Sequence, residues 1–494
     1  MTLVAGARAL ASAILVVVPL VAVAVAVPAA ANPVISSIAP DPSIQKGPDG
    51  AYHVYASSDD WADGAGRRLI PHFRSFDLVE WEYVGDAFGS RPAWAPASSF
   101  LWAPDVHVTG SGAVMYYSTG GQTPCIGMAT APGIEGPWAH GAEPIVCFGD
   151  YRGANLDPMD PEVVFRTGQA PVMVMGNFEG IHAVPMNAAG TELEGDPVLL
   201  AGTGVEAPAV VSRAGKTHLF TSAGLCCNGE VSQYRVLGGR ADTLMGPYRD
   251  RLDRPLVQPQ GPGVPLPGDV ILEGDDDWVG PGHVDVVTDD QQQDWMLYHA
   301  SPRGSAVLPN GVQRRYMMLD RLNWVEVPDR DGRWPVVGDG SGTPSSVRPA
   351  DPYVELPVRL TAVGEAALRP DGEGEVVDAS VRIDSTGIAY SGEVRATLTG
   401  PDKRRVDLPV VVEGADAPSV PVAVGAGGSV TRALTLRPAA PLAPGRYELV
   451  VSVRTTVGGA AQELAVFGLE VAPDGSLSLG SGALGSAPLG SLGG

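Results

Sequence analysis

Short apolar stretches alternate with polar turns along the first two thirds of the chain, and these stretches recur in pairs. A polar or acidic residue leads into the first stretch of each pair, and a second apolar stretch follows about ten residues later, after a Gly or Asp turn. Strand, tight turn and strand is the pattern of a β-hairpin. The five first stretches begin at residues that we call the lead residues: Asp41, Asp105, Asp160, Glu206 and His283.

The lead residues predict five repeats of one structural unit. They are spaced 64, 55, 46 and 77 residues apart, which suits the four-stranded blades of a β-propeller with long loops. The innermost strand of each blade lies beside the central channel, so we expect the lead residues to converge on one funnel. The sequence therefore predicts an all-β protein in which residues 32–340 form a five-bladed β-propeller. A β-sandwich is the alternative for this region.

The composition changes after the five repeats. All nine Trp residues lie at or before Trp334, and residues 341–353 are rich in Gly, Ser and Pro, as linkers are. Short alternating runs then recur over residues 354–472 and predict a smaller, immunoglobulin-like β-sandwich. Residues 473–494 are rich in Gly, Ser and Leu, which predicts a disordered tail.

The first 31 residues have the pattern of a secretory signal peptide. A single charged residue, Arg8, precedes a long apolar run, and small residues end the segment. Residues 1–31 are therefore expected to be removed on export, which leaves a secreted or cell-surface protein that is not bound to a membrane. A retained membrane anchor is the alternative, because the apolar run is long and its basic flank is thin.

Charge and cysteine content narrow the classes of partner. The formal net charge of −23 at pH 7 repels nucleic acid and anionic lipid and suits a neutral substrate. Four Cys residues fit an oxidising compartment. Cys125 and Cys147 could form one disulfide, whereas the adjacent Cys226 and Cys227 suggest a vicinal disulfide or two free thiols.

Three lead residues, Asp41, Asp160 and Glu206, are carboxylates that the repeat would place in one cleft. Glycoside hydrolysis needs one carboxylic acid to protonate the leaving oxygen and one carboxylate as base or nucleophile. A third acid nearby can raise the pKa of the proton donor. An acidic ring could instead hold Ca²⁺, so the repeat alone leaves both an enzyme and a binding protein open.

The lead residues lie in five motifs: Pro40-Asp-Pro-Ser-Ile44, Leu101-Trp-Ala-Pro-Asp-Val106, Asp160-Pro-Glu-Val-Val-Phe165, Glu206-Ala-Pro208 and Gly280-Pro-Gly-His283. In this order they resemble the blade motifs of glycoside hydrolase family 43, and most of all those of its endo-1,5-α-L-arabinanases. Cys226-Cys227-Asn-Gly and the segment around Trp94 are similar to the same subgroup. The resemblance covers residues 38–340.

The resemblance implies an inverting mechanism that requires no cofactor for the chemistry. By position, Asp41 matches the base that activates water and Glu206 matches the acid that protonates the departing oxygen. Asp160 matches a third carboxylate that tunes Glu206. An inverting pair needs room for water, so the carboxyl groups of Asp41 and Glu206 should lie ~6.5–9.5 Å apart. Asp157 stays an alternative to Asp160, because it also precedes a Pro.

The same resemblance suggests further site residues. Trp94 and Trp102 are expected to stack on sugar rings, with a place in the core as the alternative. Asp105 and Arg315 are expected to contact substrate, and the alternatives are a structural acceptor of backbone N–H groups and a solvent-facing side chain. His283 matches an axial histidine, and a structural Ca²⁺ near it is a hypothesis.

The sequence thus predicts a secreted, monomeric glycoside hydrolase that cleaves α-1,5-linked arabinofuranosyl polysaccharide or its oligosaccharides. An exo-acting α-L-arabinofuranosidase, a β-xylosidase of the same family and a non-catalytic sugar-binding propeller are alternatives. The three carboxylates argue against the last, because a pure binder needs no acid/base pair. Residues 354–472 contain few aromatic side chains, so a spacer is favoured there over a carbohydrate-binding module.

Overall fold

The computed structural model describes the chain from residue 32 to residue 478 with internal gaps. The described ranges are 32–121, 123–151, 156–257, 266–326, 333–338, 340–345, 358–372, 374–385, 390–401, 405–412, 415–455, 463–472 and 477–478. Within them the chain is built of strands, with one short 3-10 helix, η1 (Gly229–Val231). The all-β prediction is therefore confirmed. The expected signal peptide, residues 1–31, lies outside the described residues, and no helix within them is long and apolar enough to span a bilayer.

Five antiparallel sheets follow one another in the described part of residues 35–337. The first contains β2 (Ser43–Lys46), β3 (Tyr52–Tyr55), β4 (Pro71–Ser75) and β5 (Glu82–Asp86). The second contains β6 (Leu101–Thr109), β7 (Gly112–Thr119), β8 (Cys125–Ala131), β9 (Ala139–His140) and β10 (Val146–Cys147). The third contains β11 (Glu162–Val164), β12 (Val172–Met175), β13 (Ile181–Pro185) and β14 (Val198–Ala201).

The last two sheets complete this region. The fourth contains β15 (Val205–Arg213), β16 (Lys216–Ala223), β17 (Arg235–Ala241) and β18 (Asp269–Leu272). The fifth contains β19 (Trp278–Thr288), β20 (Asp294–Pro302), β21 (Tyr316–Glu326), β22 (Arg333–Val337) and the N-terminal β1 (Ile35–Ile38). Because β1 pairs with β21, the beginning and the end of the region share one sheet.

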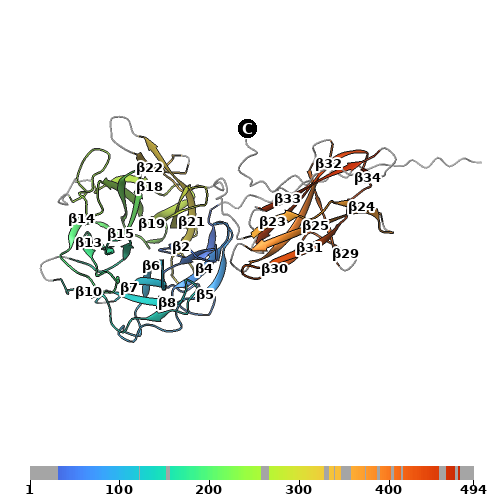
Figure 1. Cartoon of the computed structure of the whole chain (residues 1–494). Helices are drawn as coiled ribbons and strands as arrows, with labels where there is room; N and C mark the ends of the chain where they lie inside the picture. Colours follow the sequence, from blue (N-terminus) through green and yellow to red (C-terminus); the bar gives the residue numbers. More distant parts are fainter. Residues whose placement is uncertain are drawn as a thin grey trace, which may run out of the picture.

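The first strands of the five sheets meet at the centre of this region (Figure 1). Strand β2 contacts both β6 and β19, and β15 contacts both β11 and β19. Strands β6 and β11 are joined by a hydrogen bond of 2.7 Å from the Val163 N–H to Asp105 Oδ2. Apolar clusters fill the spaces between adjacent sheets; one combines Tyr52 and Phe73 of the first sheet with Trp295 of the fifth.

A left-handed residue stands at an equivalent position in each sheet, in or just before the first strand. These residues are Asp41 (φ 53°), Ala103 (φ 45°), Asp160 (φ 53°), Ala207 (φ 54°) and His283 (φ 53°). The conformation is uncommon for residues other than Gly, so its fivefold recurrence marks the true structural repeat. The repeat therefore begins at Ala103 and Ala207, and the expectation that Asp105 and Glu206 were the equivalent positions was wrong.

One ring of hydrogen bonds holds these left-handed residues in place. Each donates its backbone N–H to a side chain of the preceding sheet: Ala103 to Ser57 Oγ (2.7 Å), Asp160 to Ser118 Oγ (2.8 Å), Ala207 to Asp160 Oδ2 (3.2 Å), His283 to Ser222 Oγ (2.9 Å) and Asp41 to His299 Nδ1 (3.3 Å). Buried N–H groups that lack a partner are costly. The ring therefore stabilises a backbone conformation that the residues themselves disfavour.

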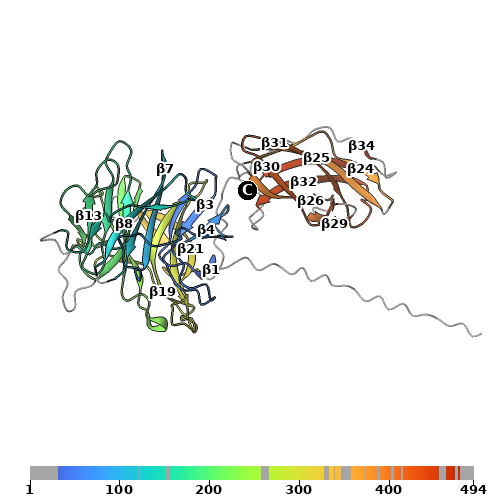
Figure 2. The ribbon, with the colours of Figure 1, turned by 90° about the horizontal axis from the view of Figure 1, so that it is seen from below.

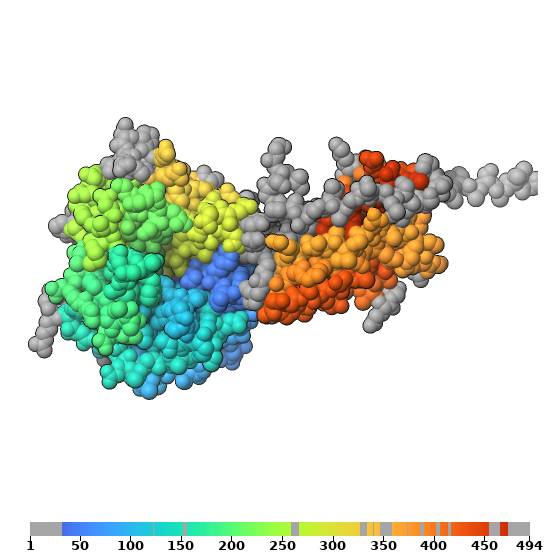
Figure 3. Space-filling view, viewed as in Figure 1, coloured from blue at the N-terminus to red at the C-terminus, as the bar shows by residue number. Residues whose placement is uncertain are grey.

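The described residues from 358 onward form two six-stranded sheets. One contains β23 (Val358–Ala362), β24 (Ala367–Pro370), β25 (Glu375–Ser385), β28 (Val410–Val412), β29 (Ala415–Ala417) and β31 (Ser429–Leu436). The other contains β26 (Tyr390–Thr399), β27 (Arg405–Leu408), β30 (Val420–Val424), β32 (Gly445–Thr455), β33 (Glu463–Val471) and β34 (Leu477–Ser478). They share one apolar core and form a second body beside the first (Figures 2 and 3).

Candidate active site

A cavity of about 260 Å³ opens where the five left-handed residues converge. All five sheets or the loops next to them contribute to its lining, which consists of Asp41, Ser58, Asp59, Phe100, Trp102, Met159, Asp160, Asn177, Glu206, Cys226, Cys227, Tyr234, His283 and Arg315. The structure therefore brings together the three carboxylates that the sequence suggested. It also brings Trp102, His283 and Arg315 to them.

Asp41 is buried, and nitrogen atoms surround its carboxylate. Its Oδ1 lies 3.1 Å from Arg315 Nη1, 3.2 Å from His299 Nδ1 and 3.3 Å from His283 Nδ1. Burial alone would raise the pKa of Asp41, but the charge of Arg315 and the contacts with the two histidines outweigh burial and hold the pKa well below its usual value. Asp41 is therefore an ionised carboxylate at any pH near neutrality.

Arg315 connects Asp41 to a second acid. Its guanidinium lies 3.1 Å from Asp41 Oδ1 and 3.4 Å from Asp59 Oδ2, and the side chain is almost fully buried. Arg315 immediately precedes β21, whose pairing with β1 brings it to Asp41. Arg315 therefore lines the cavity and is not the solvent-facing side chain that was its alternative.

Glu206 has an electrostatic environment opposite to that of Asp41. Burial raises its pKa to about 7, the negative charge of Asp41 adds to the rise, and a hydrogen bond from Tyr234 opposes it. Burial also raises the pKa of Asp160 well above its usual value, together with the charges of Glu206 and Asp41. A carboxyl group with a pKa near 7 can hold a proton at neutral pH and donate it during a reaction.

Asp160, rather than Asp157, occupies the cavity. Asp160 has the left-handed conformation of the repeat, and its Oδ2 accepts the N–H of Ala207, the residue after Glu206, at 3.2 Å. Asp157 is not among the described lining residues; burial and the charge of Glu179 raise its pKa. The geometry therefore favours Asp160 as the third carboxylate.

Two residues expected to contact substrate lie elsewhere in the described structure. Trp94 does not line the cavity; its Nε1 donates to the carbonyl oxygen of Gly141 at 3.2 Å, and its ring packs against a buried apolar cluster. Asp105 is buried, accepts the N–H of Val163 and pairs with His107 Nε2 at 2.9 Å. Both therefore match the structural alternatives rather than the expected contacts with sugar.

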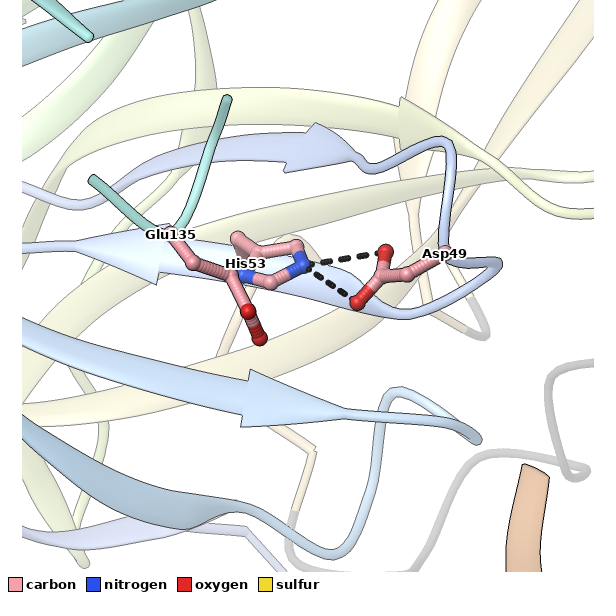
Figure 4. A group of neighbouring side chains, drawn as sticks. All are labelled: Asp49, His53 and Glu135. Carbon is pink, nitrogen blue, oxygen red and sulfur yellow. Dashed lines mark hydrogen bonds and ion pairs between the residues drawn. The ribbon is translucent and has the colours of Figure 1, made fainter. Parts of the chain in front are cut away.

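In the described ranges, His283 does not belong to a group of three His, Cys or carboxylate side chains within reach of one ion, and the Ca²⁺ near it stays a hypothesis. His283 Nδ1 faces Asp41 and the neighbouring Arg315, and burial lowers its pKa to about 4. In the described ranges, one group of three His, Cys or carboxylate side chains is close enough for a shared ion, and it consists of Asp49, His53 and Glu135 (Figure 4). His53 Nε2 hydrogen-bonds both oxygens of Asp49, while Glu135 pairs with Arg74 at 3.0 Å. These three side chains therefore already have protein partners.

Several functional positions were not singled out from the sequence. His299 and Ser222 carried no sequence signal, because their contacts arise only when the sheets meet. No role was predicted for Tyr234 either. Both suspected cysteine pairs form disulfides, and the vicinal pair Cys226–Cys227 lines the cavity.

Residues 30–328 match the family model described as "Glycosyl hydrolases family 43". The extracellular endo-α-(1→5)-L-arabinanase 1 of Bacillus subtilis is 25% identical over 287 residues, which are 55% of this chain and 81% of that protein. The extracellular exo-α-(1→5)-L-arabinofuranosidase ArbA of Cellvibrio japonicus is 27% identical over 298 residues, which are 55% of this chain and 80% of that protein.

Solved structures agree in fold with the first region. The α-L-arabinanase of Cellvibrio cellulosa in complex with arabinohexaose is 21% identical and superposes with a TM-score of 0.51, over 62% of this chain and 96% of that one. An endo-arabinanase from Bacillus licheniformis is 24% identical and superposes with a TM-score of 0.50, over 63% of this chain and 99% of that one. Because the family match spans more than half of the chain, this protein belongs to glycoside hydrolase family 43 and is a glycoside hydrolase.

Proposed function

We propose that the protein is a secreted enzyme that hydrolyses α-1,5-linked arabinofuranosyl polysaccharide by an inverting acid/base mechanism. One observation carries the proposal: a single cavity holds Asp41, whose pKa is held well below its usual value, and Glu206, whose pKa is about 7. An ionised base and a protonated acid are the pair that inverting hydrolysis requires. The arabinan-related names of the relatives support the choice of substrate.

The two carboxyl groups divide the chemistry. Asp41 takes a proton from a water molecule whose oxygen attacks the anomeric carbon, while Glu206 gives its proton to the departing glycosidic oxygen. The old carbon–oxygen bond breaks as the new one forms on the opposite face, so the anomeric configuration inverts. Asp41 ends protonated and Glu206 ionised, and proton exchange with solvent restores both. Asp160 fixes the backbone beside Glu206 by accepting the N–H of Ala207, while burial and the charge of Asp41 keep the pKa of Glu206 high.

We infer that residues 32–340 form a five-bladed β-propeller, joined by the linker 341–353 to a β-sandwich at 354–472. Five successive antiparallel sheets, mutual contacts between their first strands and apolar clusters between neighbouring sheets support the propeller. Two six-stranded sheets around one core support the sandwich. Two disulfides and the extracellular names of the relatives support secretion; the signal peptide and the monomeric state remain predictions.

The products formed from linear arabinan test the proposed function. We expect a ladder of oligosaccharides, and NMR spectroscopy should show that the first sugar anomer released is inverted. Arabinose alone would favour the exo-acting arabinofuranosidase, the action named for one relative. The Glu206→Gln variant serves as the control and should form little product. The enzymatic proposal is contradicted if the wild-type protein releases no product from any arabinofuranosyl or xylosyl polymer.

A further inference from the structure

One position in each of the five sheets lies beside the left-handed residue of the next sheet. It stands in or just after the second strand, and we call it the facing position. The five facing positions are Ser57, Ser118, Gly176, Ser222 and His299. Each lies opposite the residue that precedes the left-handed residue of its own sheet. These opposite residues, in the same order, are Pro40, Trp102, Met159, Glu206 and Gly282.

Four of the five facing positions use their own side chain to accept the N–H of the next left-handed residue. The exception is Gly176, which has no side chain to offer. Gly176 has a φ of 151°, and an added Cβ would lie 2.1 Å from the carbonyl oxygen of Gly180, so the third sheet has no room for a serine there. In its place, Asp160 Oδ2 accepts the N–H of Ala207 at 3.2 Å.

Asp41 and Asp160 are the two aspartates among the left-handed residues, and both have a φ of 53°. Their carboxylates nevertheless have different partners. The carboxylate of Asp160 is bonded to the backbone of the next sheet. For Asp41 the equivalent backbone group is the N–H of Ala103, and Ser57 Oγ already accepts it at 2.7 Å. The carboxylate of Asp41 is therefore not needed by the backbone and lies 3.1 Å from Arg315 Nη1 instead.

We propose that Ser57 is a positioning residue for Asp41. By accepting the N–H of Ala103, Ser57 leaves the carboxylate of Asp41 free to act on water, whereas Gly176 leaves the carboxylate of Asp160 tied to the backbone. The residue at the facing position thus decides which of two equivalent aspartates can serve as the base. The inference rests on the proposed function, in which Asp41 is that base.

The Ser57→Ala variant tests the inference with two substrates, linear arabinan and the 4-nitrophenyl glycoside of an α-1,5-linked arabinofuranosyl oligosaccharide. A buried N–H without an acceptor is costly, so the carboxylate of Asp41 should turn to the N–H of Ala103. We expect kcat to fall about tenfold on both substrates, because attack by water is needed whatever group departs. KM should change less than about twofold, since Ser57 is not among the described residues that line the cavity.

Ser43→Ala is the matched control. Ser43 is also buried, and its Oγ accepts the N–H of Val106 at 3.0 Å, a bond between the same two sheets. Ser43→Ala and Ser57→Ala should lower the Tm by similar amounts, but Ser43→Ala should keep kcat on both substrates within about twofold of the wild type. Wild-type kcat in Ser57→Ala, or an equal loss in Ser43→Ala, would overturn the inference. Should Ser57→Ala not fold, Ser57→Gly, which copies Gly176, decides by the same measurements.

The proposed function fails separately from this inference. If Asp41→Asn keeps the wild-type rate on arabinan, Asp41 is not the base and the proposed function fails. If Asp41→Asn is inactive while Ser57→Ala keeps the wild-type kcat, only the role of Ser57 fails. Glu206→Gln should lose far more activity on arabinan than on the nitrophenyl glycoside, whose departing group needs little help from an acid. A loss on both substrates therefore distinguishes a misplaced base from a missing acid.

Discussion

At the scale of single residues, the site separates two chemically similar groups by their surroundings. Asp41 faces the guanidinium of Arg315 and two histidine rings, whereas Glu206 is buried near the negative charge of Asp41. Positive charge stabilises an ionised carboxylate, and burial near negative charge stabilises the protonated form. The division of roles therefore follows from neighbours rather than from the residue types themselves.

The pH dependence of the rate should reflect this division. Because Glu206 must be protonated to act, kcat/KM on arabinan should fall as the pH rises through about 7, the pKa of Glu206. The acid limb should lie well below pH 3.8, because Asp41 stays ionised there. Glu206→Gln should lower kcat by about 10²–10⁴-fold and remove the alkaline limb. A wild-type limb far from pH 7, or one that survives in this variant, would contradict the assignment.

The three carboxylates were predictable because each lies next to a strand start with a Pro nearby. Asp105 was predicted wrongly, since the left-handed residue of that sheet is Ala103 and Asp105 lies two residues further along β6. There its carboxylate meets the N–H of Val163 instead of the cavity. Only the backbone conformation separates the two positions, and that conformation has no signature in an Ala-Pro-Asp sequence.

At the scale of elements, the loop between β16 and β17 shapes one wall of the cavity. It carries the Cys226–Cys227 disulfide and η1. The carboxylate of Glu230 accepts the N–H groups of Gly304 and Ala306 at 2.8 Å each, which fastens the loop to the fifth sheet's loop. The vicinal disulfide is thus presented to the cavity by a loop that is held at two points.

The two disulfides should have separable effects. Replacing both Cys226 and Cys227 with Ser should raise KM for arabinan about fivefold, equivalent to about 1 kcal/mol of binding, because cavity lining is lost. Replacing Cys125 and Cys147 opens a 22-residue separation and should cost ~3 kcal/mol of stability, with KM unchanged. Kinetic assays give KM for arabinan, and thermal unfolding gives the stability of both double variants. Equal KM values in the wild type and both variants would contradict a role of the vicinal disulfide in substrate binding.

The hairpins were predictable from the alternation of polar and apolar residues, but the partner of β1 was not. Ile35–Ile38 precedes the first repeat and pairs with β21, whose residues 316–326 come last in the region. A local pattern predicts a strand, while its partner is decided by which unpaired edge remains when the other sheets have formed. The pairing of β1 with β21, which closes the first region, is therefore known only from the structure.

At the scale of the whole molecule, the two bodies have independent apolar cores. The core of residues 358–471 consists of its own side chains, and Phe76 of the first body packs against it. Bodies with separate cores can fold and act separately. This division agrees with the spacer role expected for the second body. A truncation can test that role.

Removing residues 354–494 should leave kcat/KM on soluble arabinan within about twofold of the full chain, with retention on insoluble arabinan also unchanged. Activity assays and pull-down on the insoluble polymer measure the two quantities. Phe76→Ala in the full chain is the control, since it weakens the contact without deleting the second body. Loss of retention with intact kinetics would instead identify a carbohydrate-binding module.

The pairing of β1 with β21 also brings a buried acid and its counter-ion together from opposite ends of the first region. Ile38 pairs with Tyr316, and the N–H of Ala39 donates to the carbonyl oxygen of Arg315 at 3.0 Å. Two residues beyond Ala39 stands Asp41, whose ionised state depends on Arg315. Asp41 and Arg315 stand 274 residues apart in the sequence. The strand pairing that closes the first region therefore also supplies the positive charge that keeps Asp41 ionised despite its burial.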